Sequence, residues 1–210
     1  MAVTTESIVS WIGALASTYG EQQSYLTELD AAIGDADHGS NMARGFAAAR
    51  DDLQQDPPES PPAALKRVAM VLMKTVGGAS GPLYGTFFLK AATTCAQAEE
   101  LEGDQLLAAL AAGAEGVQQR GKAEVGDKTM VDALVPAVEA LRTSRAAGAE
   151  PADMLAAAAT AAEAGRDSTY PLIARKGRAS YLGERSRDHL DPGATSTAML
   201  FAAARDQLPG

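Results

Sequence analysis

PPAALKRVAMVLMKTV, residues 61–76, shows the pattern that decides the fold. Leu65, Val68, Leu72 and Val76 recur there at the spacing of one face of an α-helix. Residues 106–117 and 131–141 carry apolar stripes of the same kind. Working outward to the glycines and prolines that separate such stripes, we expect helices over 5–19, 21–32, 38–54, 61–76, 82–98, 103–120, 130–146 and 151–173, with a ninth candidate over 194–207. Counting the first two as one helix interrupted at Gly20 gives eight.

Composition supports an all-α protein. The 210 residues are rich in alanine, the best helix former, while aromatic residues make up 5%. This length predicts one large domain or two small ones. A net charge of −9 argues against a nucleic-acid binder, which needs a basic surface. The single cysteine, Cys95, excludes a disulfide framework, and the apolar runs are too short to cross a membrane. We therefore expect a soluble, cytoplasmic protein that does not bind membranes.

Four of the connecting segments are rich in glycine and in charged or hydroxylic residues. They cover residues 33–41, 77–81, 121–129 and 174–193. The last is long for a loop in a compact domain, and such loops are usually lids or binding segments. Because alternate loops of an antiparallel helical array lie at the same end, these four segments are expected to gather around one site.

The strongest local signal is the stretch DAAIGDADHGSN, residues 30–41. It places Asp30, Asp35 and Asp37 within eight residues. Carboxylates that close repel one another, and a divalent cation held by hard oxygen ligands relieves the repulsion. The alternative is that Asp37 only caps the next helix and the other two are solvated. On spacing alone, both interpretations stay open.

Two further segments suit an anionic ligand. Residues 77–81, GGASG, precede a helix whose N-terminus attracts anions, although a plain turn between two helices has the same composition. Residues 175–187 hold five basic residues and one acidic residue, which fits either a phosphate clamp or a solvated loop. Together with the three aspartates, these segments supply the metal-binding and phosphate-binding groups that phosphoryl transfer needs.

Two other patterns are structural. Residues 116–122, GVQQRGK, fit most of a phosphate-binding loop of the Walker type, with Lys122 as its lysine. No strand precedes the segment and Ala123 stands where the magnesium-binding hydroxyl belongs, so a Walker-type nucleotidase is not expected. Thr129 and Asp132 have the spacing of a helix capping box.

Four ordered motifs resemble the nucleotide-binding L subunits of bacterial dihydroxyacetone kinases. They are IGDADHGSN (33–41), GGASG (77–81), GDKTM (126–130) and Arg178 followed by DPG (191–193), and the similarity runs nearly end to end. The resemblance implies that residues 1–210 form a single nucleotide-binding domain. It also implies a closed barrel of eight antiparallel helices with the nucleotide site in the loops at one end.

The same resemblance implies the site residues and cofactors. Asp30, Asp35 and Asp37 would hold two Mg²⁺ ions that bridge the phosphates of ADP or ATP. The expected nucleotide-binding residues are His38, Gly39, Ser40, Asn41, Ala79, Ser80, Gly121, Met130, Arg178, Asp191, Pro192 and Gly193. No residue of this chain is expected to act as a covalent nucleophile.

The implied enzyme is a phosphotransferase with two partner chains. It would pass a phosphoryl group from the bound nucleotide to dihydroxyacetone held on a separate K subunit. A phosphohistidine M subunit of the phosphoenolpyruvate-dependent phosphotransferase system would then recharge ADP. Two alternatives remain open: a subunit of a ketose kinase that uses free ATP, and a regulatory module that senses the nucleotide without transferring phosphate.

Overall fold

The computed structural model describes residues 2–208. Within them lie nine α-helices and one 3-10 helix: α1 (Thr5–Glu21), α2 (Gln23–Ile33), α3 (His38–Gln55), α4 (Pro61–Thr75), α5 (Ser80–Thr94), α6 (Gly103–Gly121), α7 (Val131–Ala146), α8 (Pro151–Ser168), η1 (Arg178–Ser186) and α9 (Pro192–Gln207). The β structure of this part of the chain is a single bridge between Val3 and Leu101. The prediction of an all-α fold is confirmed.

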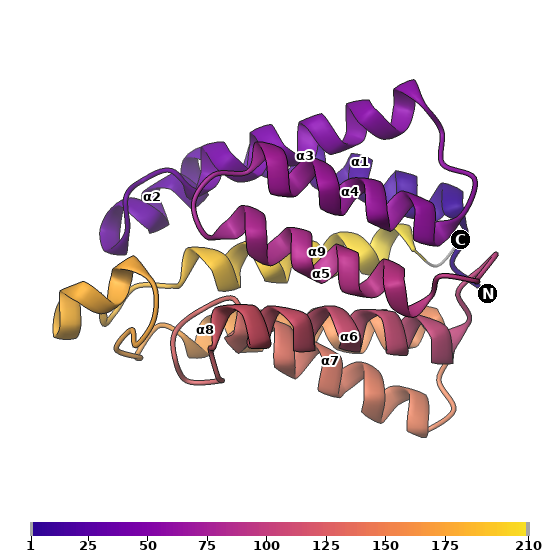
Figure 1. Cartoon of the computed structure of the whole chain (residues 1–210). Helices are drawn as coiled ribbons and strands as arrows, with labels where there is room; N and C mark the ends of the chain where they lie inside the picture. The colour runs from indigo at the N-terminus through magenta and orange to yellow at the C-terminus, as the bar shows by residue number, and fades with distance from the viewer. Residues whose placement is uncertain (1, 209–210) are drawn as a thin grey trace.

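The helices form a closed antiparallel ring (Figure 1). Each helix from α3 to α8 packs on the next one in the chain, and α1 closes the ring by packing on both α3 and α9. The loops before α3, α5, α7 and α9 therefore lie at one end, and both chain ends lie at the other (Figure 1). None of the helices among residues 2–208 is long and apolar enough to cross a membrane.

The interior combines a small aromatic cluster with many alanines. Phe46 contacts the rings of Tyr19, Tyr84 and Phe88, with ring centres 4.8–6.2 Å apart. Trp11 also packs on Phe88. Elsewhere alanines allow the helices to approach closely, because their side chains add little volume between the backbones. The ring is therefore packed rather than hollow along most of its length.

Several expected boundaries were wrong, for identifiable reasons. The break between the first two helices lies at Gln22 rather than Gly20, which sits inside α1. Because α1 and α2 are separate helices and η1 is also present, the predicted count of eight is not confirmed. Helix α8 ends at Ser168, five residues early, and Pro171 follows within one turn; proline offers no N–H and disfavours a helical residue before it. The segment 174–193 contains η1, a 3-10 stretch that is broken at Gly183, where φ is 55°, so it forms no continuous α-helix that the sequence pattern could predict.

A candidate nucleotide and metal site

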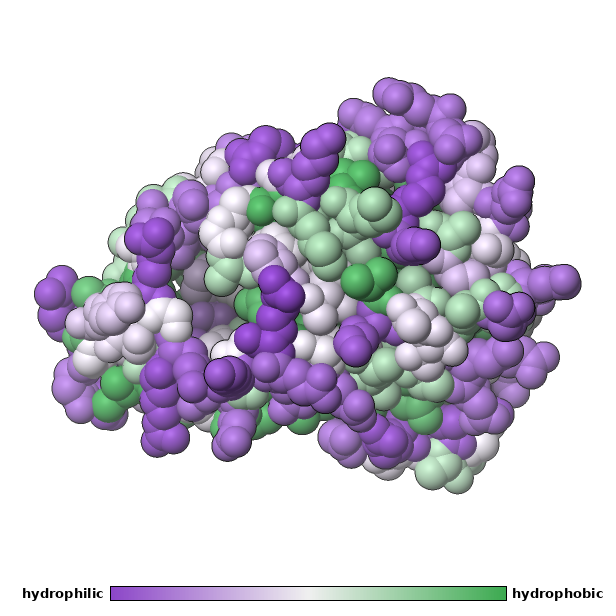
Figure 2. Space-filling view, in the orientation of Figure 1, coloured by the Kyte–Doolittle hydropathy of each residue, from purple (hydrophilic) through white to green (hydrophobic). Residues whose placement is uncertain are grey.

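The four glycine-rich loops surround a cavity of about 390 Å³ at one end of the ring. Figure 2 shows this end hollowed between the ring of helices and the segment that includes η1. We call residues 169–191, which connect α8 to α9 across the cavity, the lid. Twelve of the fifteen predicted site residues line the cavity: Asp30, Asp35, Asp37, His38, Ala79, Ser80, Gly121, Met130, Arg178, Asp191, Pro192 and Gly193.

The other three predicted residues lie behind the cavity wall. Gly39 lets α3 approach α2, since a Cβ there would lie 2.0 Å from the backbone oxygen of Gln23. The Ser40 hydroxyl donates to the carbonyl oxygen of Asp37 at 2.9 Å. Asn41 is buried, and its Oδ1 accepts a hydrogen bond from Arg44. These contacts shape the start of α3, which carries residues that do line the cavity.

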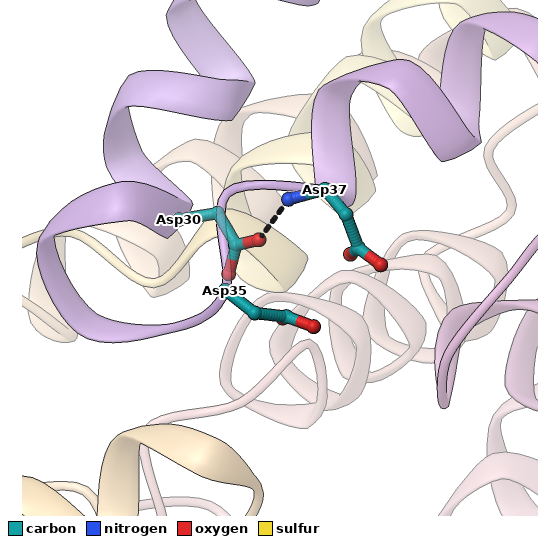
Figure 3. A group of neighbouring side chains, drawn as sticks. All are labelled: Asp30, Asp35 and Asp37. Atoms are coloured by element: carbon teal, nitrogen blue, oxygen red, sulfur yellow. Dashed lines mark hydrogen bonds between the residues drawn. The ribbon is translucent and has the colours of Figure 1, made fainter.

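Asp30, Asp35 and Asp37 form what we call the acidic corner. One carboxylate oxygen of each lies within 4.8 Å of the others, and in Figure 3 the carboxylates of Asp35 and Asp37 extend toward the same open space. Asp30 is buried at the end of α2, Asp37 is half-buried at the N-cap position of α3, and Asp35 is exposed between them. Three hard oxygen donors at this separation fit a divalent cation such as Mg²⁺.

Asp30, and not Asp37, caps helix α3. Its Oδ2 accepts the backbone N–H of Asp37 at 2.9 Å (Figure 3) and that of His38 at 3.1 Å. The side chain of Asp37 makes no capping hydrogen bond, so the interpretation of Asp37 as a simple N-cap fails. Gly34 is required beside this cap, because a Cβ there would lie 2.0 Å from Oδ1 of Asp30. Asp30 thus fixes the turn, and the carboxylates of Asp35 and Asp37 have no part in capping α3.

The lid reaches the acidic corner through Arg178. One guanidinium nitrogen lies 3.1 Å from Oδ2 of Asp35, with the two side chains 69% and 34% exposed. The lid also has a small apolar contact of its own, in which Ala174 and Ala179 pack on Ile33 apart from the main core. A positive group of the lid therefore lies directly against one of the three carboxylates.

His38 belongs to a buried hydrogen-bond chain beneath the cavity. Its Nδ1 lies 3.2 Å from the hydroxyl of Ser80, and its Nε2 lies 2.9 Å from the hydroxyl of Ser196. Ser196 in turn contacts the hydroxyl of Tyr84 at 2.8 Å. Burial lowers the pKa of His38, although the nearby carboxylates of Asp30 and Asp37 oppose the shift. Sequence reasoning missed Ser196 and Tyr84; the hydroxyl triplet 195–197 inside an apolar helix was the available signal.

Lys128 is the second feature that sequence reasoning missed. Its side chain is 1% exposed, and its Nζ donates to the backbone oxygens of Thr169 at 2.9 Å, Leu172 at 3.1 Å and His189 at 2.6 Å. Burial lowers the pKa of Lys128, while the carboxylate of Asp191 opposes the shift. The ammonium thus fastens the first and last parts of the lid to the loop that precedes α7.

Asp191 sits where the lid enters α9. Its Oδ2 accepts the backbone N–H of Ala194 at 2.7 Å, which caps α9. Burial raises the pKa of Asp191 to about 7, even though the N–H of Ala194 and the ammonium of Lys128 both act to lower it. Gly193 packs tightly against this carboxyl group, because a Cβ at Gly193 would lie only 3.0 Å from Oδ2 of Asp191. The cap therefore places in the cavity wall a carboxyl group whose charge changes with pH near neutrality.

The two patterns interpreted as structural are structural. Oδ2 of Asp132 accepts the backbone N–H of Thr129 at 2.7 Å, and Oγ1 of Thr129 accepts that of Val131 at 3.1 Å. The Walker-like residues 116–121 lie in α6, and Lys122 ends that helix in a left-handed conformation with φ of 47°. A loop that wraps a phosphate cannot form from a helix, so Lys122 has no such role.

The fold and the cavity together define a class of all-helical domain, with an acidic corner facing a basic lid. The DAK2 domain matches residues 32–206, and the chain belongs to this family. The chain is 45% identical to the ADP-binding subunit DhaL of the PEP-dependent dihydroxyacetone kinase of Escherichia coli (strain K12), over 98% of this chain and 100% of that one. It is 42% identical to the ADP-binding subunit DhaL of a PTS-dependent dihydroxyacetone kinase from Lactococcus lactis, over 95% of each chain.

Solved structures agree with the fold. The dihydroxyacetone kinase of C. freundii in its native form superposes with a TM-score of 0.75 at 27% identity, over 95% of this chain and 34% of that one. The same enzyme in complex with AMP-PNP and Mg²⁺ gives a TM-score of 0.71 at 28% identity, over 95% and 33% of the two chains. The chain thus spans about a third of that kinase.

Proposed function

We propose that this chain is the ADP-binding subunit of a phosphoenolpyruvate-dependent dihydroxyacetone kinase. The observation that carries the proposal is the acidic corner, placed in one cavity with the glycine loop 77–81 and with Arg178. The relatives that match nearly end to end carry this name. Residues 1–210 act in this proposal as one nucleotide-binding domain in the cytoplasm, with no nucleic acid or membrane as partner.

The acidic corner holds two Mg²⁺ ions in this proposal. When bound, the cations neutralise charge on the nucleotide phosphates, which three carboxylates alone would repel. The C. freundii kinase crystallised with AMP-PNP and Mg²⁺ supports this assignment. Asp30 combines two tasks, because its Oδ2 also holds the turn that presents Asp35 and Asp37.

The remaining cavity residues bind and orient the nucleotide. Ala79 and Ser80 begin helix α5, whose free backbone N–H groups suit phosphate oxygens. Gly121 and Met130 line the adenine pocket, and Arg178 adds positive charge from the lid. His38, Asp191, Pro192 and Gly193 complete the wall, while Gly39, Ser40 and Asn41 shape it from behind.

The phosphoryl group leaves the bound nucleotide for dihydroxyacetone held on a partner K subunit. This chain positions the nucleotide and excludes water, and it forms no covalent phosphoenzyme. A phosphohistidine M subunit restores ATP, so ADP stays bound as a cofactor between cycles. Phosphoryl transfer needs positioning and charge neutralisation more than covalent chemistry, which agrees with a site built of aspartates, backbone N–H groups and one arginine.

The test is to denature the purified protein and measure the ADP that is released. One equivalent that survives dialysis with Mg²⁺ supports a cofactor, whereas a freely exchanging site indicates a kinase that uses free ATP. Asp35→Asn should abolish the Mg²⁺-dependent retention. Asp51→Asn, an exposed aspartate near the other end of α3, is the matched control. Unchanged ADP retention in Asp35→Asn would overturn the metal assignment.

A further inference from the structure

Ser196 has three polar neighbours although its side chain is fully buried. Its Oγ lies 3.0 Å from the backbone oxygen of Gly193, 2.9 Å from Nε2 of His38 and 2.8 Å from the hydroxyl of Tyr84. A hydroxyl offers one proton and two lone pairs. Three neighbours therefore use the full hydrogen-bonding capacity of the Ser196 hydroxyl.

The chemistry of the neighbours assigns the protons. A carbonyl oxygen only accepts, so the proton of Ser196 goes to Gly193. The two lone pairs of Oγ can then accept from Nε2–H of His38 and from the hydroxyl of Tyr84, which also lies 3.2 Å from Oγ1 of Thr197. With this assignment every group in the chain has a partner, as expected where no buried side-chain nitrogen or oxygen among the described residues lacks one.

We propose that Ser196 is a positioning residue that holds His38 in the tautomer protonated at Nε2. The unprotonated Nδ1 then faces the cavity side and accepts the proton of the Ser80 hydroxyl across 3.2 Å. The hydroxyl of Ser80 consequently offers lone pairs, and not its proton, to whatever lies in the cavity.

This arrangement gives Ser80 two distinct faces toward a ligand. Given the proposed function, the backbone N–H at the start of α5 is the donor for a phosphate oxygen, and the hydroxyl suits a hydrated cation. A change of tautomer would turn the Ser80 hydroxyl from an acceptor into a donor toward the cavity, because Nδ1–H of His38 would then donate to its oxygen. Ser196 therefore determines, through His38, whether the hydroxyl of Ser80 donates or accepts a hydrogen bond in the cavity.

The histidine content makes the tautomer measurable. The chain has two histidines, His38 and His189, so ¹⁵N-histidine labelling gives the signals of two rings. Long-range ¹H–¹⁵N spectra at pH 8 distinguish a protonated from an unprotonated ring nitrogen, and His189→Gln identifies which ring is which. We expect His38 to be protonated at Nε2 in the unaltered protein. Protonation at Nδ1 would overturn the proposal without the need for any variant.

The variant Ser196→Ala removes the acceptor at Nε2 and should raise the population of the Nδ1–H tautomer. Tyr84→Phe keeps Ser196 in place, so the tautomer of His38 should persist. Ser10→Ala, an exposed serine on α1, is the remote control. If Ser196→Ala leaves the ratio of tautomers unchanged while the variant remains folded by circular dichroism, Ser196 does not position the ring.

Nucleotide titration provides an independent measurement. Ser196→Ala should weaken ADP binding in the presence of Mg²⁺ by about tenfold, the effect of one lost buried hydrogen bond. Ser196→Thr, which keeps the hydroxyl, should retain both the tautomer and the affinity. Failure of the unaltered protein to bind ADP would contradict the proposed function, whereas equal affinity of the unaltered protein and Ser196→Ala would contradict the positioning role.

Discussion

The acidic corner and the lid face each other across one cavity, but interactions of different range hold them in place. The corner is local: Asp30 binds the backbone of Asp37 and His38, seven and eight residues along the chain. The lid is held from a distance, because Lys128 binds carbonyl groups 41, 44 and 61 residues away. Short-range hydrogen bonds thus hold the acidic corner, and a few long-range ones hold the lid.

The packing repeats this difference. Asp30 lies on α2, which joins the main core through Leu26, whereas Ala174 and Ala179 of the lid contact Ile33 in a small cluster apart from that core. The backbone of Arg175 also donates to the oxygen of Asp127, in the same loop as Lys128. A segment with so few apolar contacts has low local stability. Loss of these hydrogen bonds should therefore unfold the lid before the ring of helices unfolds.

The largest effect is expected from Lys128→Met. This change leaves the buried carbonyl oxygen of Thr169 and the half-buried ones of Leu172 and His189 without their donor, which should lower the free energy of unfolding by about 3 kcal/mol. Urea unfolding measures this loss. Trypsin should also cut the lid at Arg175 and Lys176 faster than in the unaltered protein. Lys122→Met, at the exposed end of α6, is the control and should change neither stability nor nucleotide binding. A lid that resists trypsin in Lys128→Met would show that other contacts anchor it.

A smaller effect is expected from the pH dependence of Asp191→Asn. Because the pKa of Asp191 is raised to about 7 in the folded protein, protonation favours folding. Its contribution to stability is complete below the unfolded pKa of 3.8 and is lost as pH rises through 7. Between pH 4.5 and 6.5 the loss amounts to about 2 kcal/mol.

The asparagine variant should lack this change, since its Oδ1 still accepts the N–H of Ala194 but does not titrate. Unfolding curves of both proteins from pH 4 to 8 give the difference. His38 contributes with the opposite sign, because its lowered pKa makes folding less favourable as pH falls, but it is common to both proteins and cancels. A difference that is constant with pH would contradict the raised pKa of Asp191.

The cap on α3 predicts an effect of about 1 kcal/mol. Asp30→Ala removes the acceptor of two backbone N–H groups, and loss of such a cap typically costs this much stability. Asp35→Ala removes an exposed carboxylate that caps nothing, so the stability should hardly change. Both variants should lose Mg²⁺-dependent ADP binding. Equal stability of the two variants in thermal unfolding would contradict a capping role for Asp30.

Local patterns explain what could be predicted from the sequence. Apolar spacing located the helices because an amphipathic face repeats within a few residues, as in the stripe from Leu65 to Val76. The glycine and aspartate motifs located the cavity because turns and caps are also local. Even the wrong break at Gly20 was only two residues away from Gln22.

What could not be predicted depends on distant partners. Lys128 binds backbone carbonyls, which every residue carries and which leave no mark in the sequence. Ser196 meets His38 across 158 residues, and only the closed ring brings the start of α9 within hydrogen-bond distance of side chains on α3 and α5. The 3-10 stretch of the lid is short and broken at Gly183, so its sequence does not indicate a helix. Sequence reasoning therefore described the acidic corner well and the lid poorly, which is the same division between short-range and long-range order.

The smallest effect on stability, from Arg178→Ala, tests whether corner and lid are independent. The pair formed by Arg178 and Asp35 is largely exposed, and such a pair contributes less than about 0.5 kcal/mol. Unfolding should therefore be unchanged, while ADP binding with Mg²⁺ should weaken by about tenfold, because the arginine's charge matters to a phosphate more than to the fold. Arg185→Ala, on the same 3-10 helix but outside the cavity lining, should alter neither quantity. If Arg178→Ala instead lowers stability by more than Asp30→Ala, the lid helps to build the corner, and the two walls form one cooperative unit.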